Sequence, residues 1–164
     1  MKKLKIYLDT SVISFVFADD APEKQAITCE FFDYYLDKYN VFISDLVLAE
    51  IEQTQDDLLK SKLKNVVKKY KLEILQTNEN DQQNIFNLAQ KYIDNKIITE
   101  KYFDDAIHIA TTTYYNFDIL LSWNFKHIAN IVKQIEVNKI NQSENFIKEL
   151  YLLNPMEVIY NEEK

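Results

Sequence analysis

Short apolar runs alternate with longer segments of helical periodicity along this 164-residue chain. The short runs are rich in branched and aromatic side chains and end at polar residues, which is typical of strands. In the longer segments apolar residues recur every three to four positions, which is typical of amphipathic helices. The pattern predicts strands at residues 4–8, 41–43, 72–75, 118–121 and 147–153, and helices at about 12–17, 22–38, 45–51, 56–71, 81–95 and 100–115, with a further short helix after residue 124.

Strands separated by helices form β-α-β units with parallel strands. We therefore expect an α/β protein with a central, mainly parallel sheet that is flanked by helices. Neither an internal repeat nor a low-complexity linker interrupts the chain, and its 47% hydrophobic and 27% charged residues are those of a globular protein. We expect a single domain over residues 1–164, with a core at about 3–130 and a C-terminal extension at 131–160 that holds the last strand.

Two residue types are missing from the chain. It has no glycine, and each of its 19 basic residues is lysine. Walker loops and glycine-rich dinucleotide turns need glycine where the backbone approaches phosphate. The sequence therefore excludes P-loop NTPases and Rossmann oxidoreductases, and we expect no nucleotide cofactor. Without arginine, a phosphate contact has to come from lysine, hydroxyl or backbone N–H groups.

The net charge and the length of the apolar runs exclude further classes of partner and location. The net charge of −7 and the pI near 4.9 argue against non-specific wrapping of duplex DNA, but they are compatible with a nuclease, whose active site is itself acidic. No apolar run approaches the roughly 20 residues of a membrane span, and the run after Lys5 stops at Asp9, too early for a signal peptide. The lone Cys29 allows no internal disulfide. We expect a cytoplasmic protein that does not associate with membranes.

Polar clusters directly follow three of the predicted strands. They are Asp9-Thr10-Ser11, Ser44-Asp45 with Glu50 shortly after, and Ser122-Trp123-Asn124. In open parallel sheets, ligands bind beyond the carboxyl ends of the strands, where such clusters meet. Asp104-Asp105, near the start of the predicted helix 100–115, is a fourth contributor. Its two acids flank the apolar face of that helix almost symmetrically, so periodicity does not choose between them.

Several carboxylates in one small site repel one another and raise one another's pKa unless a cation neutralises them. Hard oxygen ligands favour Mg²⁺ or Mn²⁺, and the sequence offers neither a cysteine cluster nor a histidine pair for zinc. A carboxylate-held Mg²⁺ suits phosphodiester hydrolysis because it polarises the phosphate and activates water. The alternative is that these acids are helix caps or dipole partners, worth under about 1 kcal/mol each.

Four segments of the chain resemble a known family in order and spacing. YLDTSVIS (7–14), ISDLVLAEIE (43–52), DDAIHIATT (104–112) and ILLSWNFKHI (119–128) are similar to the PIN-domain nucleases, and most like the VapC-type toxins of bacterial toxin–antitoxin pairs. The likeness covers about residues 3–130, and LLNPMEVI (152–159) resembles the ending of one PIN subgroup. The resemblance implies a PIN-like three-layer sandwich.

The same resemblance assigns roles to individual residues. It implies that Asp9, Glu50 and Asp105 are catalytic acids that hold Mg²⁺ or Mn²⁺, with Asn124 where many members have a fourth aspartate. The implied activity is a metal-dependent endoribonuclease that acts on single-stranded RNA. Such proteins are commonly homodimers and are often held inactive by a small antitoxin. The matching positions also make helpers of four neighbours, Thr10, Ser11, Asp104 and Ser122.

Lysines are the candidates for contacts with RNA phosphates. Lys126 lies two residues after Asn124, and we interpret it as the best single candidate because of this position. The densest basic stretch spans residues 60–71 and carries six lysines. It would suit phosphate tracking, but a solvated helix face is the interpretation we favour.

Histidine and aromatic residues near the motifs have plainer interpretations. We interpret His108 and His127 as partly buried, hydrogen-bonded groups rather than functional ones, and Trp123 as a packing residue rather than a base-stacking one. Exposed aromatic patches mark partner sites, so we expect residues 15–17 or Phe31-Phe32 to contribute to a dimer or antitoxin groove.

Two other function classes stay open. A catalytically silent PIN-like module that binds RNA or a protein partner is suggested by Asn124 and by the acidic surface. Phosphatases of the haloacid dehalogenase type also begin with an aspartate at a strand end. They normally need a second aspartate two residues later, and Ser11 stands there instead. Affinity for Mn²⁺ separates the first two classes, because a module that binds no metal does not catalyse this hydrolysis.

Overall fold

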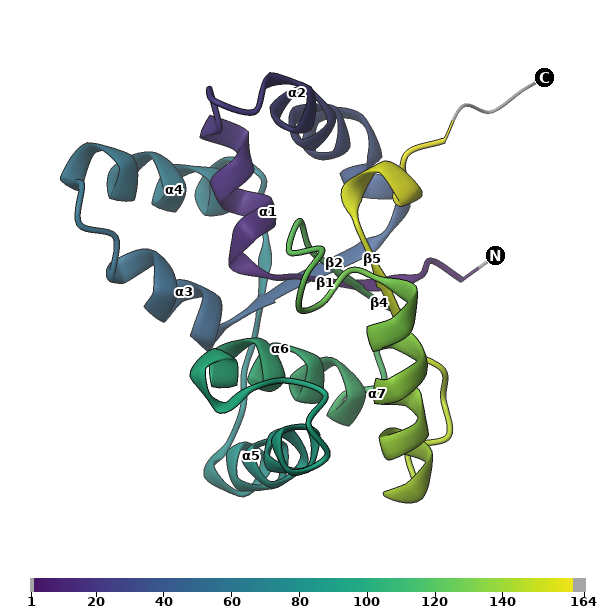
Figure 1. Cartoon of the computed structure of the whole chain (residues 1–164). Helices are drawn as coiled ribbons and strands as arrows, with labels where there is room; N and C mark the ends of the chain where they lie inside the picture. The colour runs from purple at the N-terminus through teal and green to yellow at the C-terminus, as the bar shows by residue number, and fades with distance from the viewer. Residues whose placement is uncertain (1, 161–164) are drawn as a thin grey trace.

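The structure, a computed structural model of the chain, describes residues 2–160; Met1 and residues 161–164 of the predicted single domain lie outside the described residues. Within residues 2–160, five parallel strands form one sheet in the order β3-β2-β1-β4-β5 (Figure 1). The strands are β1 (Lys5–Leu8), β2 (Asn40–Ser44), β3 (Glu73–Leu75), β4 (Ile119–Leu121) and β5 (Tyr151–Leu153). The predicted α/β fold with a parallel sheet is confirmed.

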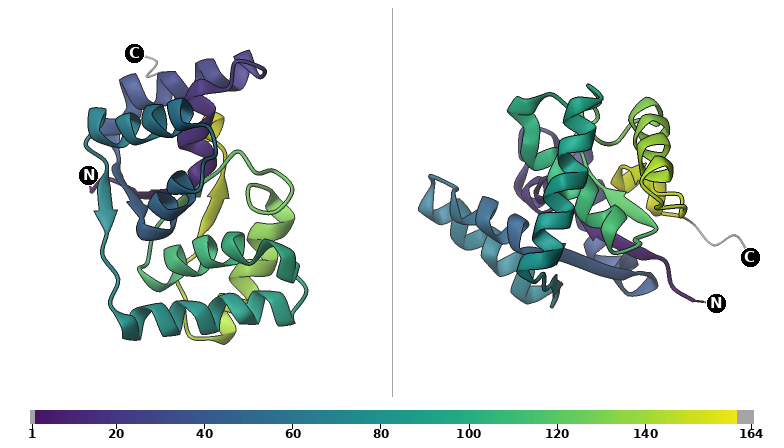
Figure 2. Two further views of the ribbon diagram at one scale, coloured as in Figure 1. Left: turned by 90° about the vertical axis from the view of Figure 1, so that its left-hand side faces the viewer. Right: turned by 90° about the horizontal axis from the view of Figure 1, so that it is seen from below.

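Helices lie on both faces of the sheet and give the molecule three layers (Figures 1 and 2). One face carries α1 (Thr10–Ser14), α2 (Pro22–Glu30) and α4 (Asp57–Lys69), and the other carries α5 (Glu79–Asp94), α6 (Phe103–Tyr114) and α7 (Ile131–Ser143). α3 (Asp45–Glu52) continues from the carboxyl end of β2 and packs against α4. Short 3-10 turns at Phe15–Phe17, Leu36–Lys38, Glu100–Tyr102 and Pro155–Val158 complete the elements.

β1 is the central strand and sets the geometry of the site. It pairs with β2 on one side and with β4 on the other, and Leu8 lies opposite Leu121. Ile6, Tyr7 and Leu8 are fully buried, because a central parallel strand is covered on both of its faces. Since β1 and β4 end level with each other, the residues that follow them are neighbours.

The predicted helix 22–38 is helical over its whole length, but its second half is not an α-helix. α2 ends at Glu30 and is followed by a π-helical turn (Phe31–Tyr35) and the 3-10 turn Leu36–Lys38. Phe31, Phe32 and Tyr35 are all buried, and the wider π turn brings these three large rings to the core side of the helix. Phe31 and Phe32 are buried and so do not form an exposed aromatic patch, which corrects the expectation that they contribute to a partner groove.

The C-terminal extension differs from the sequence pattern as well. The predicted short helix is α7, 13 residues long, and it starts only at Ile131, where Asn130 Oδ1 caps it by accepting from the Lys133 N–H. The buried side chains of α7 are mostly amides: Gln134, Asn138 and Asn141, with Val137. An inward face made of amides shows no hydrophobic periodicity, and the sequence pattern therefore missed the length of this helix.

The last strand is shorter than predicted for a related reason. Ile147 is 86% exposed, and β5 begins only at Tyr151. The backbone next to β5 is held by α7 instead of by another strand: Asn138 bonds both the N–H and the C=O of Leu150, and Gln134 Oε1 accepts from the N–H of Leu152. These amides thus cover the outer edge of β5.

Among residues 2–160, none of the helices combines the length and apolar character that crossing a membrane requires.

Candidate active site

Asp9 stands at the carboxyl end of β1, beside the end of β4. Its backbone N–H donates to the carbonyl of Leu121 over 3.2 Å, which places its side chain next to Ser122. Oδ1 of Asp9 accepts from the Ser11 hydroxyl at 2.5 Å, and Oδ2 accepts from the Ser122 hydroxyl at 2.5 Å. Asp9 is only 4% exposed. It occupies the N-cap position of α1, where its side chain makes no capping bond within hydrogen-bond geometry in the described chain, and its two side-chain hydrogen bonds are to the hydroxyls of Ser11 and Ser122.

The two serines that hold Asp9 are themselves held by the loop after β4. Ser11 Oγ accepts the backbone N–H of Trp123 at 2.9 Å, and Ser122 Oγ accepts that of Asn124 at 2.9 Å. Each hydroxyl therefore accepts a hydrogen bond from a backbone N–H of the loop and donates one to the Asp9 carboxylate. The arrangement fixes the Asp9 carboxylate from both sides.

Glu50 reaches the same region from α3. Its Oε1 accepts from the Thr10 hydroxyl at 2.8 Å and from His108 Nε2 at 2.6 Å. Thr10 directly follows Asp9, so Thr10 and Glu50 link the end of β1 to α3. The structure thus brings these two predicted residues together.

His108 connects Glu50 to the core. It lies on α6 and is 1% exposed, and its Nδ1 is 2.6 Å from the hydroxyl of Tyr7, which lies 2.7 Å from Ser44 Oγ. The interpretation of His108 as a buried, hydrogen-bonded group is confirmed, and its partner is one of the candidate acids. Ser44 belongs to one of the polar clusters named from the sequence. Tyr7 was not singled out, although it precedes Asp9 by two residues, a spacing that places both on one side of a strand.

The structure distinguishes Asp105 from Asp104. Asp105 is partly buried and lies one turn before His108 on α6, whereas Asp104 is exposed. Asn124 Nδ2 donates to Asp105 Oδ2 at 3.3 Å, and Asn124 Oδ1 accepts the backbone N–H of His127 at 3.0 Å. Asn124 therefore joins the loop after β4 to the first turn of α6.

Electrostatics show that Asp9, Glu50 and Asp105 share one region. Burial raises the pKa of Asp105 to about 6, and the charges of Asp9, Glu50 and Asp104 act in the same direction, while His108 opposes them. Burial also raises the pKa of Asp9, although His108 and the two serine hydroxyls lower it. The cluster therefore carries negative charge that its surroundings only partly compensate.

Glu50 and His108 shift in the directions expected of an ion pair. Burial raises the pKa of Glu50, but the hydrogen bond and charge of His108, with the Thr10 hydroxyl, outweigh burial and leave it below its usual range. Burial lowers the pKa of His108, but the bond to Glu50 and the charges of Glu50, Asp9 and Asp105 outweigh it and leave it raised.

The donors in this cluster suit a hard divalent cation. They are carboxylate, hydroxyl and amide oxygens, the ligands that Mg²⁺ and Mn²⁺ prefer. Burial is the main cause of the raised pKa of Asp105, and the charges of Asp9, Glu50 and Asp104 add to it; a cation would offset both effects. Among residues 2–160, no three acidic, histidine or cysteine side chains stand in a preformed metal-ligand arrangement. The residues present fit such an ion by donor chemistry and charge, although these acids do not already stand in a metal-ligand arrangement.

The other predicted residues lie around the cluster. Lys126 is exposed on the loop just beyond Asn124. Trp123 is 4% exposed and donates from Nε1 to Thr28 Oγ1 at 2.8 Å, so its interpretation as a packing residue is confirmed. The His127 ring lies 4.0 Å from that of Tyr102, measured between centroids, and burial with the charges of Lys126 and Lys133 lowers its pKa. Most lysines of the stretch 60–71 are exposed on α4, and one of them, Lys64, forms an ion pair with Glu52.

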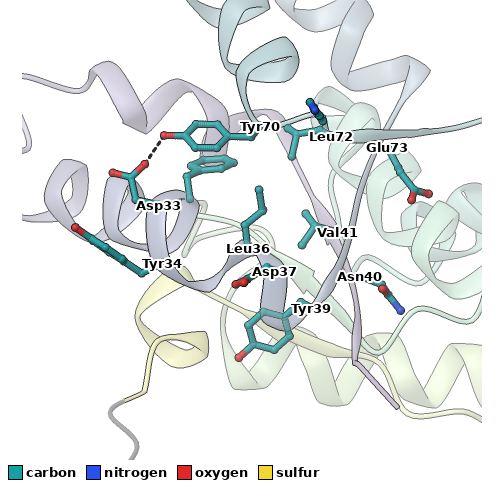
Figure 3. Close-up of a pocket in the computed structure, with 12 residues that line it drawn as sticks. Asp33, Tyr34, Leu36, Asp37, Tyr39, Asn40, Val41, Tyr70, Leu72 and Glu73 are labelled. Carbon is teal, nitrogen blue, oxygen red and sulfur yellow. Dashed lines mark hydrogen bonds between the residues drawn. The ribbon is translucent and has the colours of Figure 1, made fainter. Parts of the chain in front are cut away.

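A surface pocket of about 630 Å³ lies away from this cluster (Figure 3). It opens at the other end of the strands, where Asn40 begins β2 and Glu73 begins β3, and Tyr70 donates to Asp33 across one wall at 2.6 Å. None of its lining residues is one of the predicted site residues. We therefore place the candidate site by the convergence of its acids and not by the size of a cavity.

The fold and the acidic cluster define an α/β protein with a nuclease-type architecture. Comparison with known protein families matches residues 6–130 to the PIN domain. The chain belongs to the PIN domain family, whose members are generally nucleases and typically use divalent metals. A search of the curated proteins found no significant match. The predicted PIN-like three-layer sandwich is confirmed by this match and by the arrangement of the sheet.

Proposed function

We propose that this PIN domain is a metal-dependent endoribonuclease that hydrolyses RNA phosphodiester bonds, and that it is the VapC-like toxin of a toxin–antitoxin pair. The observation that carries the nuclease part is the meeting of Asp9, Glu50 and Asp105. They come from the end of β1, from α3 and from α6, and their charges act on one another. Acids that converge from three elements beyond the strand ends of a PIN fold suit catalysis of phosphodiester hydrolysis.

Asp9, Glu50 and Asp105 would hold Mg²⁺ or Mn²⁺. When bound, such a cation polarises the phosphate and lowers the pKa of water for attack. Asn124 adds no charge, so the site offers three carboxylates to the cation rather than four. Thr10, Ser11 and Ser122 hold the carboxylates Glu50 and Asp9 through the hydroxyl bonds described above.

The chain's own groups would then bind and orient the RNA. Among the described residues, Asp105 accepts a hydrogen bond only from Asn124, through Oδ2. Its Oδ1 is therefore the carboxylate oxygen best suited to orient the attacking water. Lys126 would contact a phosphate from the loop beyond Asn124.

The toxin role, a small antitoxin partner, a homodimer and a cytoplasmic location are parts of this proposal. They rest on the likeness of the four motif segments to VapC-type toxins. Apolar side chains on the outer face of α7 offer one surface for a protein partner: Ile131, Val132 and Ile135 are each more than half exposed.

A catalytically silent PIN-like module that binds RNA or a protein partner is the second candidate. Two observations favour it: no preformed metal-ligand arrangement exists within residues 2–160, and Asn124 replaces a fourth acid. Such a module would still bind RNA, but it would not cleave RNA when Mn²⁺ is added.

Cleavage of single-stranded RNA in Mn²⁺, Mg²⁺ or EDTA tests the proposal, with wild type, Asp105→Asn and Asp104→Asn purified in parallel. Asp104→Asn is the matched control, because it removes the same charge from the adjacent, exposed residue. We expect metal-dependent cleavage by wild type and Asp104→Asn and none by Asp105→Asn. Equal cleavage by all three would indicate a contaminating ribonuclease. Folded wild type that neither cleaves RNA nor binds Mn²⁺ would favour the binding module.

A further inference from the structure

A buried line of hydrogen bonds runs from Ser44 to Glu50 through Tyr7 and His108. The distances are 2.7 Å from Ser44 to Tyr7, 2.6 Å from Tyr7 to His108 and 2.6 Å from His108 to Glu50. Ser44, Tyr7 and His108 are each less than 5% exposed. Polar groups buried this deeply are kept in place by their partners, since a lost bond leaves an unsatisfied group in the interior.

The line begins and ends at the same helix. Ser44 occupies the N-cap position of α3, but its side chain makes no capping bond within the described chain and bonds to Tyr7 instead. Glu50 lies on α3 itself. Between Ser44 and Glu50 the hydrogen bonds pass through Tyr7 on β1 and His108 on α6. They therefore tie α3 to β1, which Asp9 follows, and to α6, which carries Asp105.

Glu50 receives both of its hydrogen bonds on one oxygen. Thr10 and His108 donate to Oε1, and Oε2 accepts no hydrogen bond from residues 2–160. A glutamate side chain loses much rotamer freedom when it is ordered, and two donors on Oε1 hold it in one orientation. That orientation leaves Oε2 available to a cation.

We propose that Tyr7 and His108 are positioning residues that hold the Glu50 carboxylate so that Oε2 serves as a metal ligand. The proposal rests on the proposed metal-dependent function and goes beyond it, because neither residue touches the cation or the RNA. Partners behind a metal ligand set its orientation, and their loss commonly weakens metal affinity.

The assignment holds in either protonation state of His108. A carboxylate oxygen accepts, so Nε2 carries a hydrogen that points to Glu50. In the neutral ring the Tyr7 hydroxyl donates to Nδ1, and in the charged ring Nδ1 donates to that hydroxyl. Tyr7 therefore fixes the plane of the ring in both states, and Ser44 fixes Tyr7.

Tyr7→Phe tests the proposal with the least disturbance. It removes the hydroxyl but keeps the ring, which packs edge-on against Phe117 with centroids 5.9 Å apart. Tyr92→Phe is the matched control: Tyr92 is also fully buried, and its hydroxyl donates to Asn141 at 2.5 Å, among α5, α6 and α7 and not in the line to Glu50. His108→Gln tests the next link, and Glu50→Gln shows the effect of losing the ligand.

The measurement is Mn²⁺ affinity of the full chain by calorimetry, with thermal unfolding of each metal-free variant. We expect Tyr7→Phe and His108→Gln to weaken Mn²⁺ binding about 10- to 100-fold, and Tyr92→Phe to leave it unchanged even where it lowers stability as much. In the Glu50→Gln background, Tyr7→Phe should cause no further loss. If His108→Gln does not fold, Tyr7→Phe decides alone.

The contrary outcomes are distinct. Wild-type affinity in Tyr7→Phe would overturn the positioning role and leave the nuclease function standing. Equal losses in Tyr7→Phe and Tyr92→Phe would overturn it as well, because the effect would then be one of general stability. A wild-type chain that binds no Mn²⁺ would overturn both the positioning role and the proposed function.

Discussion

The side-chain amide of Asn124 donates to Oδ2 of Asp105 across 3.3 Å and ties the loop after β4 to the first turn of α6. An aspartate at position 124 would lack this donor and would add a charge of the same sign. Asn124 therefore supports an acidic cluster that, within the described residues, has His108 as its one adjacent cationic partner.

Asn124→Asp should destabilise the metal-free protein and strengthen its response to Mn²⁺. At pH 7.5 the lost hydrogen bond and added repulsion should lower the free energy of unfolding by about 1 kcal/mol, or the melting temperature by roughly 2–4 °C. Mn²⁺ should then raise the melting temperature more than in wild type, because a fourth carboxylate meets the cation. Asn124→Ala, which loses the bond without adding charge, is the control. An equal rise in melting temperature on addition of Mn²⁺ in both variants would contradict the prediction.

Asp105→Asn should stabilise the metal-free protein at neutral pH. Burial and neighbouring charges raise the folded-state pKa of Asp105 from 3.8 to about 6, so ionisation costs stability as pH rises through this interval. With solvent screening of a partly exposed group, the cost is about 1–2 kcal/mol above pH 6 and vanishes below pH 4.

Urea unfolding of wild type and Asp105→Asn at pH 4 and pH 7.5 measures this cost. The stability gain of the variant should appear at pH 7.5 and be small at pH 4. Asp104→Asn, which changes an exposed carboxylate, should show no such difference between the two pH values. A gain of the same size at both pH values would mean that ionisation of Asp105 is not its cause.

Ser122→Ala should lower the free energy of unfolding, because it leaves the buried Asp9 carboxylate without one of its hydrogen-bond donors. The substitution removes the hydroxyl that donates to Asp9 Oδ2 at 2.5 Å. A buried carboxylate oxygen left without its donor costs about 1–3 kcal/mol, which urea unfolding at pH 7.5 would detect. The control is Ser143→Ala, on the exposed end of α7, where the effect should stay within about 0.5 kcal/mol. Equal effects at both positions would argue against a special role of Ser122.

Lys126→Ala should weaken RNA binding without changing metal binding. If Lys126 contacts one phosphate, the slope of log affinity against log salt concentration should fall by about one. Binding is measured by fluorescence anisotropy with an Asp105→Asn background, so that the RNA stays intact. Lys139→Ala, which removes an exposed lysine from α7, serves as the control. An unchanged salt slope in Lys126→Ala would exclude the phosphate contact.

The sequence singled out the candidate acids, but not all of the groups that hold them. Asp9 and Glu50 were candidates because polar residues that follow apolar strands gather at one edge of a parallel sheet. Periodicity did not separate Asp105 from the acid before it, and only the resemblance to PIN-domain nucleases favoured Asp105. Tyr7 was not a candidate, because a tyrosine inside an apolar run looks like any other core residue until its hydroxyl has a partner. Ser44 stood in a polar cluster after a predicted strand, but only the three-dimensional arrangement shows that its hydroxyl bonds to Tyr7.

Hydrogen-bond partners that the sequence pattern does not show also explain where the fold prediction failed. The strands of the sheet, buried on both faces, read as apolar runs and were predicted to within a few residues, except for the last one. α7 was missed in length because Gln134, Asn138 and Asn141 point inward and bond to backbone and buried partners. Hydrogen bonds that satisfy a buried amide connect residues far apart in the chain, and hydrophobic periodicity contains no record of them.

Three acids from three elements are proposed to bind a divalent cation. Calorimetric titration of Mn²⁺ into metal-free wild type, Asp9→Asn, Glu50→Gln, Asp105→Asn and Asp104→Asn measures this binding. We expect saturable binding by wild type and by Asp104→Asn, and a loss of at least about ten-fold in affinity in each of the other three. Absence of binding in the folded wild type, or wild-type affinity in all four variants, would overturn the proposed site.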